Sequence, residues 1–208
     1  SDSLWQLAAT AGNYINTQGN IGWTTNATAT YSGGENAWVY SPCFDLTELD
    51  KPMIEMSIWR NTLSSIDGAV LQYHDAISNS WKVLGRYGKG VHWYQDGYVV
   101  SAPGEQTNVP VGWSGNSGGF ENARYRLDNI EADLRYRNDV RFRVSFSSDS
   151  ATLAGTYDGF AFDSVRIGNR TRSVLIEHFS GNGYPGIESI EDRLYETIYS
   201  NLLSLIHI

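Results

Sequence analysis

The chain has little cysteine and proline, and no long hydrophobic run. Its 208 residues include one cysteine and five prolines. A single cysteine excludes an intramolecular disulfide, and the lack of a CxxC pair excludes a zinc site built on cysteines. No apolar run approaches the roughly 20 residues that a membrane-spanning helix needs. We therefore expect no membrane span.

Positive charge is also scarce. Lysine and arginine together number 15 against 23 aspartates and glutamates, which gives a formal net charge of −8. An acidic chain is repelled by a phosphate backbone, so we expect no nucleic-acid partner. The same sign of charge suits a cation such as Ca²⁺, and it equally serves solubility.

Glycine and aromatic residues are plentiful instead. The chain has 21 Gly, 7 Trp, 13 Tyr and 7 Phe. Together with many Ser, Thr and Asn, this composition is typical of strands and turns. Residues 140–146 alternate strictly, with Val and Phe on one face and Arg and Ser on the other, which predicts a strand with one wet face. Other predicted strands cover residues 37–42, 53–59, 69–73, 81–84 and 159–167.

This pattern predicts an all-β sandwich or barrel over residues 1–170. We expect the first of these strands to stop at Pro42, and we interpret 85–122 as loops with at most one strand or short helix. The pattern changes at Ser173. A strand at 174–179, a Gly-rich loop and apolar residues at helical spacing predict the strand–loop–helix start of an α/β domain over 171–202.

Both ends of the chain suggest a piece of a larger protein. No signal peptide is recognisable, and residue 1 is Ser, so a signal upstream remains compatible with the sequence. Residues 203–208 resemble the translation of a transposon end used in sequencing libraries. We expect this tail to be an artefact, with an ordinary apolar helix end as the alternative.

Four segments, read in order, resemble the MAM-like jelly-roll domains of the choice-of-anchor type in Bacteroidetes surface proteins. Their matching residues are Trp38, Ser41, Pro42, Asp45 and Leu46, then Asp67 and Gly68, then Trp81 and Leu84, and finally 140–149 with 159–165. The resemblance implies a concanavalin-like jelly-roll β-sandwich. Residues 174–181 resemble the opening strand of thioredoxin-like domains, but without cysteine this segment is unable to exchange thiols.

The same resemblance implies a structural Ca²⁺ between an early carboxylate and the Asp of the last strand. Asp163 matches that last-strand Asp, and Glu35 and Asn36 are the candidate early ligands. Calcium takes six to eight oxygen ligands of this kind. The alternative is that Asp163 accepts a backbone N–H or caps a turn.

Aromatic residues in the Gly-rich stretch form a candidate ligand site. Exposed rings stack on sugars, and neighbouring Asp or Asn side chains bind their hydroxyls. The alternative is that large rings fill the core or cover its rim. The candidate ligand-binding residues are Trp93, Tyr94, Asp96, Tyr98, Trp113 and Asn116.

No catalytic constellation stands out. Ser114 lies in a Gly-Trp-Ser-Gly context but lacks the strand–turn–helix setting of a nucleophile elbow. The arginines between 124 and 143 predict a solvated face paired with the surplus carboxylates, with an anionic ligand as the alternative. Cys43 is expected to be a small buried apolar residue.

The sequence therefore predicts a non-catalytic binding or adhesion module of a secreted or cell-surface bacterial protein, with a glycan or a surface protein as its partner. The alternative is an accessory domain of a secreted hydrolase, such as a peptidase, whose catalytic domain lies outside these residues. A third interpretation is a structural spacer without a ligand. Fold resemblance alone does not decide between them.

Overall fold

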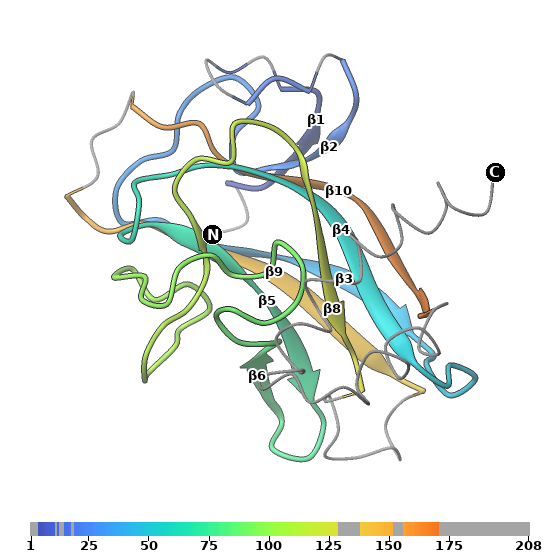
Figure 1. Cartoon of the computed structure of the whole chain (residues 1–208). Coiled ribbons are helices and arrows are strands. Elements are labelled where there is room, and N and C mark those ends of the chain that lie inside the picture. The colour runs from blue at the N-terminus through green and yellow to red at the C-terminus, as the bar shows by residue number, and fades with distance from the viewer. Residues whose placement is uncertain are drawn as a thin grey trace, which may run out of the picture.

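The computed structural model describes residues 4–10, 12, 15–17, 19–128, 138–151 and 156–170. This part of the chain is all-β and contains no helix. It forms two antiparallel sheets that pack face to face as a β-sandwich (Figure 1). The strands are β1 (Gln6–Ala8), β2 (Gly22–Thr24), β3 (Asn36–Phe44), β4 (Pro52–Asn61), β5 (Gly68–Asp75), β6 (Ser80–Val83), β7 (Trp113–Ser114), β8 (Glu121–Arg126), β9 (Val140–Ser147) and β10 (Gly159–Asn169).

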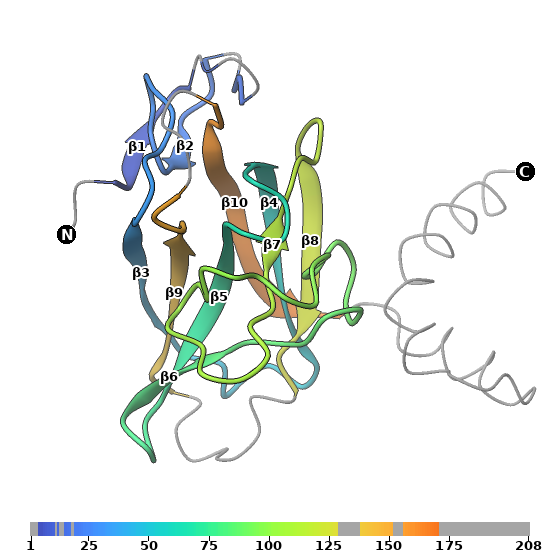
Figure 2. The same cartoon turned by 90° about the vertical axis from the view of Figure 1, so that its left-hand side faces the viewer.

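Neighbours within each sheet come from distant parts of the chain. The first sheet has the order β1-β2-β10-β4-β8. The second has the order β3-β9-β5-β6, with the short β7 added to β5. Figure 2 shows β3, β9 and β5 in one layer and β10, β4 and β8 in the other.

The core lies between these layers because each long strand sends every second side chain inward. Strand β4 alternates buried and half-buried residues along most of its length, with Ile54, Met56 and Ile58 in the core. The predicted alternation of β9 is confirmed on its inner face, where Phe142 and Phe146 are buried. Apolar burial on this scale is the main favourable term in folding.

The long segment between β6 and β8 closes one side of the sandwich. It runs from the second sheet to the first and carries β7, which pairs with β5. Val91 forms a bridge with Arg124 of β8. The indole of Trp113 stacks on Phe160 of β10 at 5.6 Å between ring centroids. The large rings of this segment therefore fill the core between the two sheets on this side of the sandwich.

Two details differ from the sequence-based expectations for β3. The strand continues through Pro42 to Phe44, because a bulge between Tyr40 and Cys43 takes the proline out of the ladder with β9. Cys43 is exposed, not buried, and its Sγ accepts a hydrogen bond from Arg141 Nε at 2.9 Å.

The predicted strand–loop–helix segment at 171–202 and the tail at 203–208 lie outside the described residues, so these predictions stay open. Nowhere in the described ranges does a helix occur that has the length and apolar character to cross a membrane.

Candidate functional site

Three of the predicted sugar-stacking rings are core residues. Trp93, Tyr94 and Trp113 are 3%, 1% and 0% exposed. Trp113 packs edge to face on both other rings, and Trp93 and Tyr94 are tilted on one another, with centroids 4.8–5.5 Å apart. The Tyr94 hydroxyl donates to the carbonyl of Leu71 at 3.0 Å. These rings are inaccessible to a sugar, so the prediction of a platform on them is wrong and the core-filling alternative holds.

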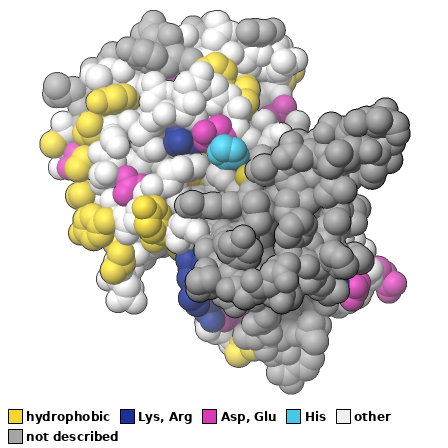
Figure 3. Space-filling model, viewed as in Figure 1, with side chains coloured by type: hydrophobic (Ala, Val, Ile, Leu, Met, Phe, Trp, Pro, Cys, Tyr) yellow, Lys and Arg dark blue, Asp and Glu magenta, His cyan; other side chains and the backbone are white. Residues whose placement is uncertain are grey.

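The other three candidates stay at the surface. Tyr98 is exposed, and Asp96 accepts hydrogen bonds from Ser65 Oγ at 2.7 Å and from the backbone N–H of Tyr98 at 3.1 Å. Asn116 is exposed and accepts a hydrogen bond from the backbone N–H of Gly118. Figure 3 shows exposed hydrophobic side chains mainly along the left-hand edge of this face. Asp96 and Asn116 thus order the loops in which they lie.

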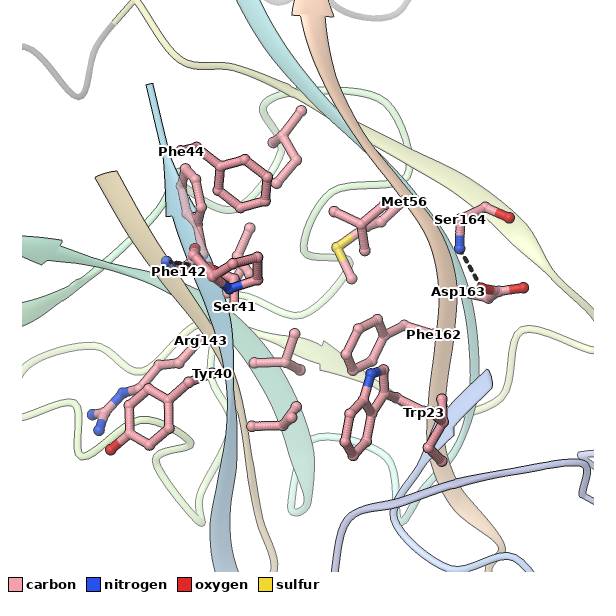
Figure 4. A pocket seen from close by; sticks show the side chains of 17 residues that line it. Trp23, Tyr40, Ser41, Phe44, Met56, Phe142, Arg143, Phe162, Asp163 and Ser164 are labelled. Carbon is pink, nitrogen blue, oxygen red and sulfur yellow. Dashed lines mark hydrogen bonds between the residues drawn. The ribbon is translucent and has the colours of Figure 1, made fainter. Parts of the chain in front are cut away.

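The three candidate calcium ligands lie on different sheets. Asp163 is in β10, next to the inward-facing Phe162, and its side chain points away from the interior (Figure 4). Its Oδ1 accepts the backbone N–H of Ser164 at 2.6 Å, as the alternative interpretation predicts. Asn36 begins β3 in the second sheet, and Glu35 directly precedes this strand. The structure does not bring these residues together, and the described residues contain no group of three or more His, Cys, Asp or Glu that could hold a metal ion.

A different set of aromatic residues meets on the outer face of the second sheet. Trp38 and Tyr40 come from β3, and Trp81 comes from β6, three strands further across the sheet. The centroids of the Tyr40 and Trp81 rings are 5.5 Å apart, and His74 packs edge-on against Trp81 at 5.3 Å. We call Trp38, Tyr40, His74 and Trp81 the aromatic face.

Strand register explains this meeting. Tyr40 of β3 lies opposite Arg143 of β9, and Arg143 lies opposite Gln72 of β5. The last step across the sheet pairs His74 with Trp81. Residues opposite one another in an antiparallel ladder point to the same side. Side chains from all four strands therefore share one surface.

Arg143 is the centre of this surface. Its guanidinium carbon lies 4.7 Å from the ring centroid of Trp38 and 4.7 Å from that of Trp81, distances at which a cation is attracted to an aromatic face. Its Nε donates to Gln72 Oε1 at 2.7 Å. Arg143 is only 5% exposed, so the predicted wet face of β9 is covered here. Burial lowers the pKa of Arg143, against the opposing effects of Tyr40 and Glu105.

A loop borders the aromatic face on its β5 side. Gln72 Nε2 donates to the carbonyl of Gly104 at 2.8 Å, and Glu105 Oε2 lies 4.0 Å from Arg143 Nη2. Gly104 has a φ of 73°, and a side chain there would collide with the Gln72 amide. Ala102 and Glu105 also have positive φ, at 51° and 60°. Such strained backbone clusters at ligand sites.

The β5–β6 hairpin holds Trp81 and His74 in place. Asp75, at the end of β5, pairs with Lys82 and accepts a hydrogen bond from Ser78 Oγ at 2.7 Å. These two contacts lower the pKa of Asp75 to about 2. The carboxylate also accepts the backbone N–H of Ile77 at 3.1 Å, which fixes the turn before Trp81.

The aromatic face has a chemistry suited to neutral, hydroxyl-rich ligands. Tyr40 is 55% exposed, and Trp38, His74 and Trp81 are half-buried, so ring surface remains for stacking. Glu105 is exposed and offers acceptors beside these rings. Ring faces with a few placed polar groups are typical of ligand sites.

Other side chains that the sequence singled out are structural. Ser114 Oγ donates to the carbonyl of Asp67 at 2.7 Å and accepts the N–H of Ser65 at 2.9 Å, so it closes a loop. Arg124 pairs with Glu55 at 2.8 Å and Arg141 with Asp139 at 3.8 Å. The prediction that arginines pair with surplus carboxylates is confirmed for these two, whereas Arg135 and Arg137 lie outside the described residues.

Sequence reasoning missed the aromatic face because its residues are far apart in the chain. Trp38 and Trp81 entered only as markers of a resemblance within predicted strands, and Tyr40 only as part of the predicted strand 37–42. Alternation was the available signal, since Trp38 and Tyr40 are two apart and therefore share a face.

No family model and no curated protein matches the chain.

Proposed function

We propose that this domain is a jelly-roll module of a secreted or cell-surface bacterial protein and that it binds glycans on the aromatic face without catalysing a reaction. The module serves adhesion or substrate attachment for the larger protein. The jelly-roll assignment is supported by the two interleaved sheets, in which neighbouring strands come from distant parts of the sequence.

The carrying observation is that Trp38, Tyr40 and Trp81 meet around Arg143 on an otherwise polar sheet face. The C–H faces of a pyranose ring pack on indole and phenol rings, and its hydroxyls bond to flanking polar groups. Glu105 and the tips of Tyr40 and His74 are the flanking groups in this case. The Gln72 amide already forms hydrogen bonds with Arg143 and Gly104, so it holds Arg143 in place and does not contact the ligand.

A glycan array followed by calorimetry tests the proposal. We expect Trp81→Ala and Tyr40→Ala each to weaken binding of a selected glycan by roughly threefold to tenfold, because a stacked ring contributes about 0.5–1.5 kcal/mol beyond its buried area. Stacking on Trp81 should also shift the tryptophan emission of the wild-type protein.

Trp59→Ala is the matched control. Trp59 is half-buried as well and packs on Phe120 at 5.1 Å, but β4 carries it in the first sheet, away from the aromatic face. Its loss should leave glycan affinity unchanged. Wild-type affinity in Trp81→Ala, or an array without any glycan bound, would overturn the proposal.

A further inference from the structure

A cavity of about 310 Å³ lies between the two sheets, on the side opposite the segment that closes the sandwich with Trp93 and Trp113. Its walls come from both layers (Figure 4). Phe44 and Phe142 line it from the second sheet, and Trp23, Met56 and Phe162 line it from the first.

Two β-bulges frame the mouth of this cavity. One interrupts the ladder of β3 with β9 between Tyr40 and Cys43, and the other interrupts the ladder of β10 with β4 between Asp163 and Arg166. The residues inside both bulges line the cavity. Ser164 has a φ of 52°, outside the extended region. Bulges bend strands and occur beside binding sites, so the opening is built into both sheets.

The bulges also decide what kind of occupant fits. Strand β2 pairs with β10 at Ala161 and Phe162. Beyond Phe162, the edge of β10 next to the mouth has no strand partner among the described residues. A bulge at a strand edge disfavours the addition of another strand, and Pro42 on the facing edge has no N–H to donate. A volume near the lower end of the usual range for ligand pockets, about 300–1,000 Å³, suits a small molecule.

The polar groups near the mouth specify a neutral ligand. Ser41 Oγ donates to the carbonyl of Pro42 and accepts the N–H of Phe142, so it is occupied. The Arg143 side chain points to the aromatic face and away from the cavity (Figure 4). Asp163, the other charged residue that lines the cavity, also points its side chain away from it (Figure 4), so a charged headgroup inside would lose its hydration without gaining a partner.

We propose that this cavity is a second binding site, for a small neutral apolar ligand such as an alkyl chain or an aromatic ring. A ligand of this kind makes van der Waals contacts with the apolar walls of the cavity, and these contacts favour its binding. The cavity and the aromatic face lie on opposite sides of the second sheet. Tyr40 and Arg143 also line the cavity, but their side chains point to the aromatic face (Figure 4).

The neutral fluorescent probe N-phenyl-1-naphthylamine tests the proposal on the full chain. We expect saturable, one-site enhancement of its fluorescence. Val39 lines the cavity, so Val39→Phe should weaken probe affinity at least tenfold. Val100→Phe is the matched control, because Val100 is exposed and outside the cavity. Trp81→Ala should also bind the probe normally, which separates this site from glycan binding.

Competition on the wild-type protein keeps the proposal testable if Val39→Phe unfolds. At pH 8 we expect n-decanol to displace the probe at a concentration at least tenfold lower than decanoate does. Absence of fluorescence enhancement, unchanged affinity in a folded Val39→Phe variant, or equal potency of the alcohol and the carboxylate would each overturn the proposal.

Discussion

Asp67 is fully buried, and its carboxylate organises one end of the core. The hydroxyl of the buried Tyr31 donates to Oδ2 at 2.8 Å, and the backbone N–H of Asp149 donates to Oδ1 at 2.7 Å. The Tyr31 oxygen in turn accepts the N–H of Leu63 at 3.1 Å. Buried polar groups are tolerated only when they are hydrogen-bonded in this way.

Stability should fall in alkaline solution because of the buried tyrosines. Burial raises the pKa of Tyr31 and Tyr94 well above the ordinary 10.0. Above pH 10 the unfolded chain releases protons that the folded chain keeps, so each tyrosine lowers the free energy of unfolding by about 1.4 kcal/mol per pH unit. Below pH 10 both states keep these protons, and the tyrosines contribute no pH dependence.

Urea unfolding of wild type and Tyr31→Phe between pH 8 and pH 11 checks this prediction. At pH 8 the variant should be less stable by about 1–2 kcal/mol, because Asp67 and Leu63 lose a partner. Above pH 10 its stability should decline less steeply than that of the wild type. Equal slopes would mean that Tyr31 ionises alike in both states.

Strands with strong alternation or β-branched runs could be predicted from the sequence, and shorter ones could not. All six strands predicted within residues 1–170 are present, and β9 faces the core as expected. Strands β1 and β2 have three residues each and are defined by their pairing, which no local pattern reveals. Local pattern likewise does not distinguish Trp93, which enters the core from a Gly-rich loop, from Trp81, which lies on a sheet face.

The β10 bulge offers a test at the level of a strand. Ser164 has a φ of 52°, a conformation that costs an L-residue about 1–2 kcal/mol. We expect Ser164→Gly to keep or slightly raise the free energy of unfolding. Ser164→Val should lower it by about 1–2 kcal/mol, because a β-branched side chain disfavours this backbone.

Ser57 provides the control for this substitution. It lies in β4 opposite Asp163, is half-buried and is not among the residues with positive φ. Ser57→Val should therefore be tolerated within about 0.5 kcal/mol, since valine suits a strand. Equal losses at both positions in chemical denaturation would rule out backbone strain as the cause.

At the scale of the whole molecule, the sandwich places the two proposed binding sites on separate surfaces. The segment with Trp93, Tyr94 and Trp113 seals one side, the cavity opens on the other, and the aromatic face covers the outside of the second sheet. The calcium site that the resemblance implies has no support in this arrangement, because the described residues contain no group of three or more His, Cys, Asp or Glu that could hold a metal ion.

Thermal unfolding with Ca²⁺ and with chelator tests that point. A ligand that binds only the folded state raises the melting temperature by mass action. We expect equal melting temperatures in both solutions. A higher value with Ca²⁺ that disappears in Asp163→Asn, but persists in the exposed control Glu48→Gln, would restore the calcium site.

The one thiol of the chain has a practical consequence. Cys43 is exposed on β3, and its Sγ contacts Arg141, two residues along β9 from Arg143. A maleimide dye therefore attaches at one defined position, on the strand that also carries Trp38 and Tyr40. If the proposed glycan binds the aromatic face, a dye on Cys43 should change its emission, and no engineered cysteine is needed for this readout.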